Sequence, residues 1–191
     1  MSLPHITNSE AGRKLYDPVF KNIFEVYFSL PEPLQRTFGK DTALITEHVT
    51  KINGLAALNR APGTGTQKFM GTERTFVNPK LENTSAEIEV TFNLNLRNAT
   101  DNYIYKIFRA WAALGYNINT GERHLKKDYC AEHMKVSIAN QAGDIYREVV
   151  FKDVMINGDI QGSHEELDYD SADALELVVK FKSDWWTETM V

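Results

Sequence analysis

Apolar and polar side chains alternate without a break through residues 85–96, and this pattern limits what the chain can form. One set of alternate positions is apolar: Ile88, Val90, Phe92, Leu94 and Leu96. The other set is polar: Glu87, Glu89, Thr91, Asn93 and Asn95. Successive side chains of a β-strand point to opposite faces, so the pattern predicts a strand with one buried and one hydrated face. A row of polar groups on one face indicates a hydrated sheet surface rather than an enzyme pocket.

Three other segments also predict strands. Residues 175–186 alternate in the same way, with apolar positions at Leu175, Leu177, Val179 and Phe181, and end on an aromatic pair. Residues 23–30 read as a short strand, and residues 134–152 read as a hairpin with its turn at 140–144. The chain is therefore predicted to be mainly β.

Residues 98–114 carry the one clear helical pattern. Thr100 suits the N-cap, Asp101 suits the positive end of the helix dipole, and Gly115 suits the C-terminal stop. The apolar stripe follows helical spacing, and its predicted core residues are Ile104, Phe108 and Trp111. The predicted fold class is a β-sandwich or barrel-like domain with one lateral α-helix.

The remaining segments have weaker patterns. Residues 1–20 are predicted to be an extended N-terminal arm, and residues 21–191 a single domain. Prolines and a glycine predict a loop over residues 31–40, and residues 42–52 favour a strand. The glycine-rich stretch 53–80 is either a surface loop or an extended hairpin that orders against a neighbouring subunit.

Composition excludes several classes of function. The 191 residues carry a formal net charge of −5, whereas a duplex-DNA-binding protein normally carries a basic patch or stripe. The single cysteine, Cys130, permits no intrachain disulfide, and no apolar run is long enough to span a membrane. These features predict a chain that folds in the cytoplasm and does not insert into a membrane.

No set of residues predicts catalysis or a cofactor. Cys130 and His133, with His124 and Asp128 upstream, are zinc-ligand types, but no second pair follows at a zinc-site spacing. The acidic residues of segment 165–173 lack the spacing and the central glycine of a calcium-binding loop. Gly63 and Gly65 are not followed by the lysine and hydroxyl residue of a phosphate-binding loop. The sequence therefore predicts no enzyme, no metal site and no cofactor.

Taken in order, several segments resemble the tail tube proteins of contractile-tailed bacteriophages, which are related to the tubes of other contractile injection systems. Residues 22–30 resemble the family's first strand, and residues 70–76 resemble its lead-in to an inner strand. Residues 105–111 are similar to its lateral helix, and residues 129–153 to the hairpin that follows. The end of the chain is similar too: residues 151–158, 167–172 and 178–185.

This resemblance implies a subunit whose sheet joins neighbouring sheets into a ring-wide β-barrel. Six copies would form a ring, and rings would stack into a tube that conducts DNA without binding it specifically. The hydrated strand face would line the lumen, although packing decides which face points inward; the lumen candidates are Glu87, Glu89, Asn93 and Asn95. Glu87 and Glu89, repeated around each ring, would make a negative wall. The arm and the long loop would bridge successive rings, with contact candidates Leu58, Arg60, Phe69, Met70, Tyr16 and Phe20.

The implied partners are the sheath, tape-measure, baseplate and terminator proteins, and the implied location is the virion tail, assembled in the host cytoplasm. Three alternatives stay open. The tube could belong to a phage-derived injection system or type VI-like apparatus that carries effectors. The chain could be a baseplate or terminator protein with the tube fold. In another class altogether, it could be a monomeric β-barrel that binds a small apolar ligand.

Overall fold

The computed structural model describes residues 22–39, 42–55, 64–77, 85–94, 103–158, 160–162 and 175–190. The predicted arm lies outside these ranges, as do four inter-ring contact candidates, Tyr16, Phe20, Leu58 and Arg60, and the lumen candidate Asn95. The predicted helix cap at Thr100 and the acidic run at 165–173 also lie outside them.

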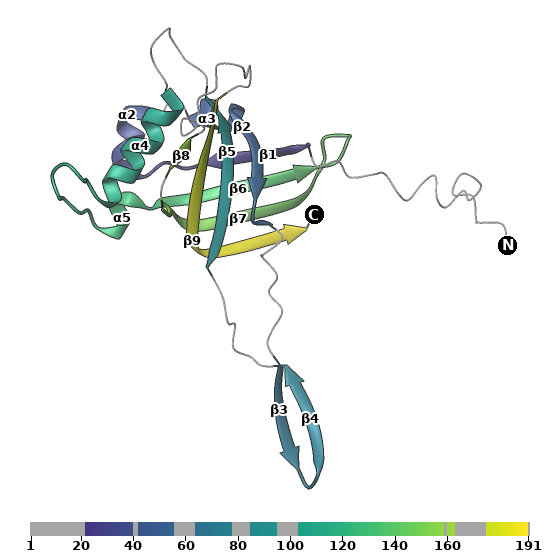
Figure 1. Ribbon diagram of the computed structural model, residues 1–191. Helices are drawn as coiled ribbons and strands as arrows, with labels where there is room; N and C mark the ends of the chain where they lie inside the picture. Colours follow the sequence, from purple (N-terminus) through teal and green to yellow (C-terminus); the bar gives the residue numbers. More distant parts are fainter. Residues whose placement is uncertain are drawn as a thin grey trace, which may run out of the picture.

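Within the described residues, seven antiparallel strands form one barrel-like sheet (Figure 1). The strand order is β1 (Phe24–Phe28), β6 (Ala131–Ala139), β7 (Ile145–Ile156), β9 (Glu176–Met190), β5 (Ala86–Asn93) and β2 (Val49–Asn53). The short strand β8 (Gln161–Gly162) pairs with β9 opposite Leu177 and Val178. The prediction of a mainly β, barrel-like fold is confirmed.

Strand β9 forms the corner of this sheet. It pairs with β5 as far as Ser183 and with β7 as far as Met190, and between these two partners it bends (Figure 1). The buried positions alternate up to Ser183, and the next one is Trp186 instead of residue 185. Buried positions jump by three residues on the paired strands as well, from Phe151 to Val154 and from Ala131 to Met134. The sheet therefore bends at paired positions on three neighbouring strands.

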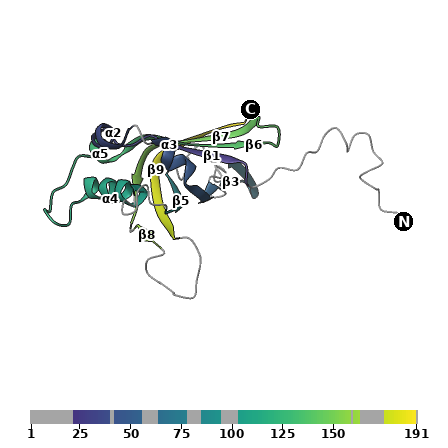
Figure 2. The same cartoon turned by 90° about the horizontal axis from the view of Figure 1, so that it is seen from above.

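Three of the helices gather at one end of the sheet, while the β6–β7 hairpin projects from the other (Figure 2). The longest described helix, α4 (Tyr103–Gly115), is the predicted lateral helix. Three shorter helices were not predicted: α2 (Glu32–Phe38), α3 (Thr42–Glu47) and α5 (Lys126–Tyr129). No helix in the described part of the chain is both long and apolar enough to cross a membrane.

Two of these helices correct sequence predictions. The predicted loop at 31–40 contains α2, because proline in the first turn starts a helix as readily as it marks a loop. The pair Leu34 and Phe38, four residues apart, then packs against the core. The predicted strand at 42–52 is α3 followed by β2, and Ile45 of α3 is fully buried. Helix α3 contacts β1, the edge strand of the sheet.

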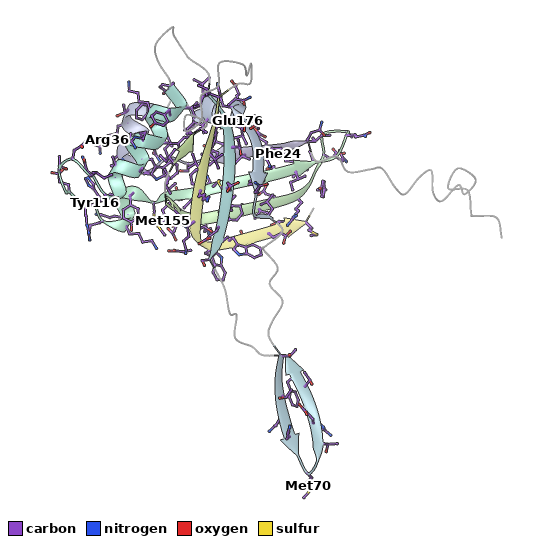
Figure 3. The ribbon with its side chains drawn as sticks, in the orientation of Figure 1. Phe24, Arg36, Met70, Tyr116, Met155 and Glu176 are labelled. Carbon is purple, nitrogen blue, oxygen red and sulfur yellow. The ribbon has the colours of Figure 1, made fainter. Side chains whose placement is uncertain are left out.

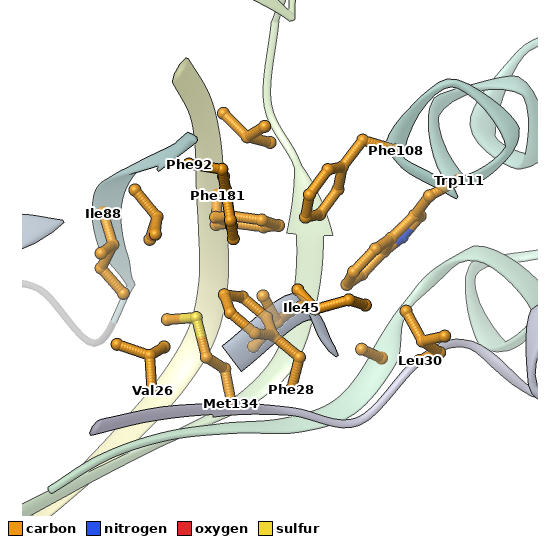
Figure 4. Close-up of a cluster of buried hydrophobic side chains, with 14 of the residues drawn as sticks. Val26, Phe28, Leu30, Ile45, Ile88, Phe92, Phe108, Trp111, Met134 and Phe181 are labelled. Carbon is orange, nitrogen blue, oxygen red and sulfur yellow. The ribbon is translucent and has the colours of Figure 1, made fainter. Parts of the chain in front are cut away.

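Aromatic rings from four elements meet in the core (Figure 4). Phe108 of α4 lies 4.7 Å from Phe92 of β5, and Trp111 lies 5.7 Å from Phe181 of β9, measured between ring centroids. The indole nitrogen of Trp111 donates a hydrogen bond to the Tyr129 carbonyl at 2.8 Å, which ties α4 to α5. Ile104, Phe108 and Trp111 are all buried, as the helical spacing predicted. Burial of large aromatic rings is worth several kcal/mol per side chain.

Two more strands, β3 (Thr64–Phe69) and β4 (Thr72–Val77), form a hairpin apart from the larger sheet (Figure 1). Its turn consists of Met70 (φ 47°) and Gly71 (φ 79°), a two-residue turn with both φ angles positive. Of the two readings left open for residues 53–80, the described part supports the hairpin. Residues 70–76 therefore form its turn and most of its second strand, and the next strand in the chain is β5 of the larger sheet.

Gly54, just after β2, generates the first prediction. Its φ is +100°, and a Cβ there would lie 2.5 Å from the Glu87 carbonyl oxygen of the paired strand β5. Gly54→Ala is expected to destabilise the fold by about 1–3 kcal/mol, through a strained backbone and a clash with main chain that cannot move aside. Urea unfolding followed by tryptophan fluorescence measures this.

Gly115→Ala is the matched control, because a Cβ at Gly115 meets no atom within 4 Å. It is expected to leave stability unchanged or to raise it by up to about 1 kcal/mol. Equal losses in the two variants would contradict the close approach of β2 to β5.

Candidate assembly surfaces

The outward face of β5, β9 and β2 is the hydrated surface that the sequence predicted. Ile88, Val90 and Phe92 are buried, whereas Glu87, Glu89 and Asn93 point away from the core. Cross-strand neighbours extend this face to Lys180 and Lys182 of β9 and to Lys51 and Asn53 of β2. It is a polar surface across three strands, interrupted at Thr91, which is only 5% exposed and lies opposite Val178, so this one position differs from the prediction.

Charges on this face are balanced, which corrects the expectation of a negative wall. The Lys182 ammonium lies 3.2 Å from a Glu87 carboxylate oxygen, and Lys180 lies directly opposite Glu89. Glu89 also accepts a hydrogen bond from the Asn53 amide at 3.0 Å. Glu176 and Lys51 lie on the same face, which therefore carries three carboxylates and three ammonium groups. The prediction considered one strand alone, and the basic residues come from its neighbours in the sheet.

The larger sheet has open edges. The register of β9 with β5 ends at Ser183, so Thr187–Met190 has β7 on one side and no strand from the described residues on the other. Strand β2 likewise pairs only with β5 among the described strands. An open edge presents backbone donors and acceptors that can add a strand from another chain.

The β3–β4 hairpin offers a second kind of surface. The side chains of residues 64–68 and 70–76 are all exposed, including Met70 at 91% and Phe76 at 50%. Within the hairpin, the Lys68 ammonium forms an ion pair with a Glu73 carboxylate oxygen on the opposite strand, 3.9 Å away. An isolated two-stranded hairpin is marginally stable in water at best. Its exposed methionine and phenylalanine therefore favour packing against another molecule (Figure 3).

The structure does not assemble the residues that could have carried chemistry. His133 stacks on Tyr27, with the two ring centroids 5.8 Å apart, and Cys130 is buried at the end of α5. Burial raises the pKa of the Cys130 thiol, although the nearby Lys126 ammonium opposes the shift, so the thiol is a poor nucleophile at neutral pH. His124 and Asp128 lie at or near the surface, and no described group of three or more histidine, cysteine or carboxylate residues could hold a metal ion.

Sequence reasoning missed Lys180 and Lys182 as members of the polar face. Glu87 and Lys182 are 95 residues apart in the chain, so only the β5–β9 register brings them together. The signal was present in the alternation of the last strand, where both lysines occupy the polar positions. The open edge at Thr187–Met190 was missed because the strand was predicted to end at its aromatic pair.

The chain matches no protein-family model and no curated protein sequence. Its fold matches solved structures. A chain of the PVC sheath-tube complex of an extracellular contractile injection system, in its extended state, has a TM-score of 0.57 and 12% identity, covering 96% of this chain and 99% of that chain. A chain of the anti-feeding prophage cap, which terminates the AFP tube, has a TM-score of 0.55 and 13% identity, covering 93% and 94%.

A chain of the PVC sheath/tube terminator in its extended state also matches, with a TM-score of 0.55 and 12% identity, covering 92% of this chain and 99% of that chain. These matches run along nearly the whole of each chain. The protein therefore has the fold of tube-related components of contractile injection systems, and the resemblance in fold predicted from the sequence is confirmed.

The pairing of charges on the polar face generates the second prediction. A double-mutant cycle with Glu87→Gln and Lys182→Gln is expected to give a coupling free energy of about 0.2–1 kcal/mol, because both groups are partly exposed. Urea unfolding in low salt measures it, and about 1 M salt should abolish most of it.

Glu32 and Arg36 on α2 are the matched control pair, because they lie 3.8 Å apart and both side chains are more than 80% exposed. Their coupling is expected to be smaller. If Glu87 and Lys182 show no coupling free energy in low salt, the pairing of charges on the polar face is contradicted.

Proposed function

We propose that this chain is a structural subunit of the inner tube of a contractile tail or injection apparatus. The observation that carries the proposal is a subunit with open sheet edges and an exposed hairpin, in a fold shared with tube-related proteins. Such a subunit satisfies its open backbone groups by assembling. The solved structures with this fold belong to structural assemblies, which supports a non-enzymatic role.

Ring closure is the first step of the proposed assembly. The open edge of β9 at Thr187–Met190 and the open edge of β2 belong to the same sheet. Pairing of the β9 edge of one copy with the β2 edge of the next would join the seven-stranded sheets into one continuous barrel. A closed ring of this kind leaves neither of these two edges exposed. Six copies per ring is the number that the family resemblance implies.

Stacking of rings is the second step. The β3–β4 hairpin would reach the adjacent ring, with Met70 at its tip and Phe69 and Phe76 on its strands. Met70 and Phe76 are exposed, and two exposed large apolar side chains in a hairpin of this size fit a contact that buries them. The other inter-ring candidates, Leu58, Arg60, Tyr16 and Phe20, are proposed from the resemblance alone.

The polar face would line the lumen, with Glu87, Glu89, Asn93 and Asn95 among its residues. With its charges balanced, such a wall neither attracts nor strongly repels a polyanion. Cargo would slide along it without specific binding. DNA is the cargo of the first proposal, and the location is then a virion tail with sheath, tape-measure, baseplate and terminator proteins as partners.

Two alternatives keep the same fold. A tube that carries effectors would use the same ring and stacking contacts. A terminator or baseplate subunit is also supported, since chains of a tube cap and a sheath/tube terminator are among the matches. Such a subunit forms rings but does not extend them. A monomeric binder of apolar ligands is not favoured, because aromatic and aliphatic side chains of the sheet and α4 fill the core.

Electron microscopy of the purified chain tests the proposal and gives the third prediction. Wild-type protein at high concentration is expected to form rings and tubes. Phe76→Asp is expected to shorten or abolish tubes while rings persist, because it places a charge where stacking would bury an aromatic ring. A wild-type chain that remains monomeric at high concentration would refute the tube assignment.

Phe76→Leu is the matched control, since it keeps an apolar side chain at the same site, and it should still form tubes. Thermal unfolding should be alike in all three proteins, because Phe76 is exposed in the subunit. If Phe76→Asp still forms tubes of normal length, the hairpin is not part of the stacking contact.

Labelling of assembled tubes gives the fourth prediction. A cysteine introduced by Glu89→Cys is expected to react with N-ethylmaleimide but to be shielded from a maleimide that carries a bulky polyethylene glycol chain. Background labelling is low, because the only native cysteine is buried and its raised pKa keeps it protonated. Mass spectrometry measures both reactions.

Thr37→Cys on α2 is the control, because Thr37 is exposed at the helical end of the molecule. It should react with both reagents. If the bulky reagent labels Glu89→Cys as fast as Thr37→Cys in tubes, the polar face does not line the lumen.

A further inference from the structure

The loop between α4 and α5, residues 116–125, is held in one conformation by its own hydrogen bonds. Asn117 bonds through its backbone to Glu122 at 3.0 Å and to Gly121 at 2.7 Å. Its side-chain oxygen also accepts the backbone N–H of Asn119 at 3.0 Å. Gly121, with φ at +72°, permits the tight return of the chain. The loop is thus a preformed surface, which lowers the entropy lost on binding a partner.

This preformed loop presents apolar and basic groups together. Ile118 is 82% exposed, Leu125 is 66% exposed, and Tyr116 is 49% exposed with the Arg123 guanidinium 5.4 Å from its ring centroid (Figure 3). His124 and Lys127 are also exposed. Glu122 lies on the same loop and Asp128 on the adjoining helix α5, where the Lys126 ammonium is paired with Asp184 of β9. Large exposed apolar side chains that the described residues leave uncovered favour contact with a further segment or molecule.

The distribution of charge along the sequence indicates an acidic partner for this loop. Residues 163–174 contain five carboxylates and no lysine or arginine: Glu165, Glu166, Asp168, Asp170 and Asp173. Outside this segment 21 acidic side chains balance 21 basic ones, so the segment holds the whole net charge of −5. It also contains Leu167 and Tyr169 between the carboxylates. Its composition, acidic with apolar residues, complements that of the loop.

The residues that flank the acidic segment lie beside α4, whereas the loop follows the end of that helix. Gly162 is opposite Leu177, which is itself opposite Phe92, and Phe92 contacts Phe108 in the middle of α4. Leu175, which follows the acidic segment, accepts through its carbonyl a hydrogen bond from the Leu94 N–H at 2.9 Å. The loop follows Gly115, the last residue of the helix. A donor and an acceptor at separate places on one subunit suit a head-to-tail contact between copies.

We propose that the loop of one copy, residues 116–125, together with Lys127 at the start of α5, receives the acidic segment 163–174 of a neighbouring copy. Arg123 and Lys127 face the carboxylates of the segment, and Ile118 and Leu125 cover its leucine and tyrosine. This contact goes beyond the proposed function, because it uses neither the sheet edges nor the hairpin. It holds or fails whether or not tubes form.

A peptide titration tests this contact and gives the fifth prediction. The probe is a fluorescent synthetic peptide of residues 163–174, and the host is the full chain with the five carboxylates of its own segment changed to amides. The peptide is expected to bind the host, and a peptide with amides in place of its carboxylates to bind at least about fivefold more weakly. Raising salt from about 0.1 M to about 1 M should weaken the acidic peptide, because the screening length falls from about 10 Å to about 3 Å.

Host variants locate the contact. Arg123→Glu together with Lys127→Glu is expected to weaken binding roughly fivefold to tenfold, and Ile118→Ser should weaken it with less dependence on salt. The control is Lys106→Glu, a charge reversal at an exposed position of α4 outside the loop, which should change binding less than about twofold. Circular dichroism confirms that each variant is folded.

Three outcomes overturn the proposal. The first is a host that binds the acidic peptide no better than the amide peptide. The second is equal binding by the loop variant and the Lys106 variant. The third concerns the wild-type chain at concentrations where copies stay separate: if it already excludes the peptide, its own segment occupies the loop and the contact is within one copy.

Discussion

Pairing of backbone groups along β9 is the constraint on which the rest of the subunit depends. The strand first pairs with β5 on one side and β7 and β8 on the other, then bends and continues along β7 alone. Its buried residue Phe181 lies against Trp111 of α4, and buried Trp186 lies beyond the bend. Because one strand belongs to both halves of the sheet, the same strand supplies core residues and the open edge. Filling the core with Phe181 and its neighbours fixes where the unpaired edge at Thr187–Met190 must lie.

The sequence predicted those elements whose pattern is local. Alternation identified β5, β6, β7 and the first half of β9, and helical spacing identified α4 with Phe108 and Trp111 in the core. It failed where short segments carry two meanings. Pro31 and Pro33 mark a loop or the first turn of a helix with equal force, and tertiary contacts of Leu34 and Phe38 decided for the helix. Thr42–Glu47 favoured a strand by residue type, and burial of Ile45 against the core made it helical.

The candidate surfaces divide in the same way. Glu87 and Glu89 were placed on the hydrated face from their own strand, but the charge of that face depends on Lys180 and Lys182, which the register brings from the far end of the chain. A two-residue turn at Met70–Gly71 was equally hard to predict, because methionine rarely takes a positive φ. The bend near Ser183 has no local signal either, since three strands change their buried positions together there. Long-range pairing, rather than composition, set these features.

If the polar face lines the lumen as proposed, its balance of carboxylates and ammonium groups has a consequence for transport. A uniformly anionic channel gathers cations, and its effect on a charged passenger changes with the surrounding electrolyte. In a channel walled by paired opposite charges, short-range dipoles take the place of a net field. Passengers of either sign then meet the same low friction, and dilute or concentrated media make little difference to how fast they travel.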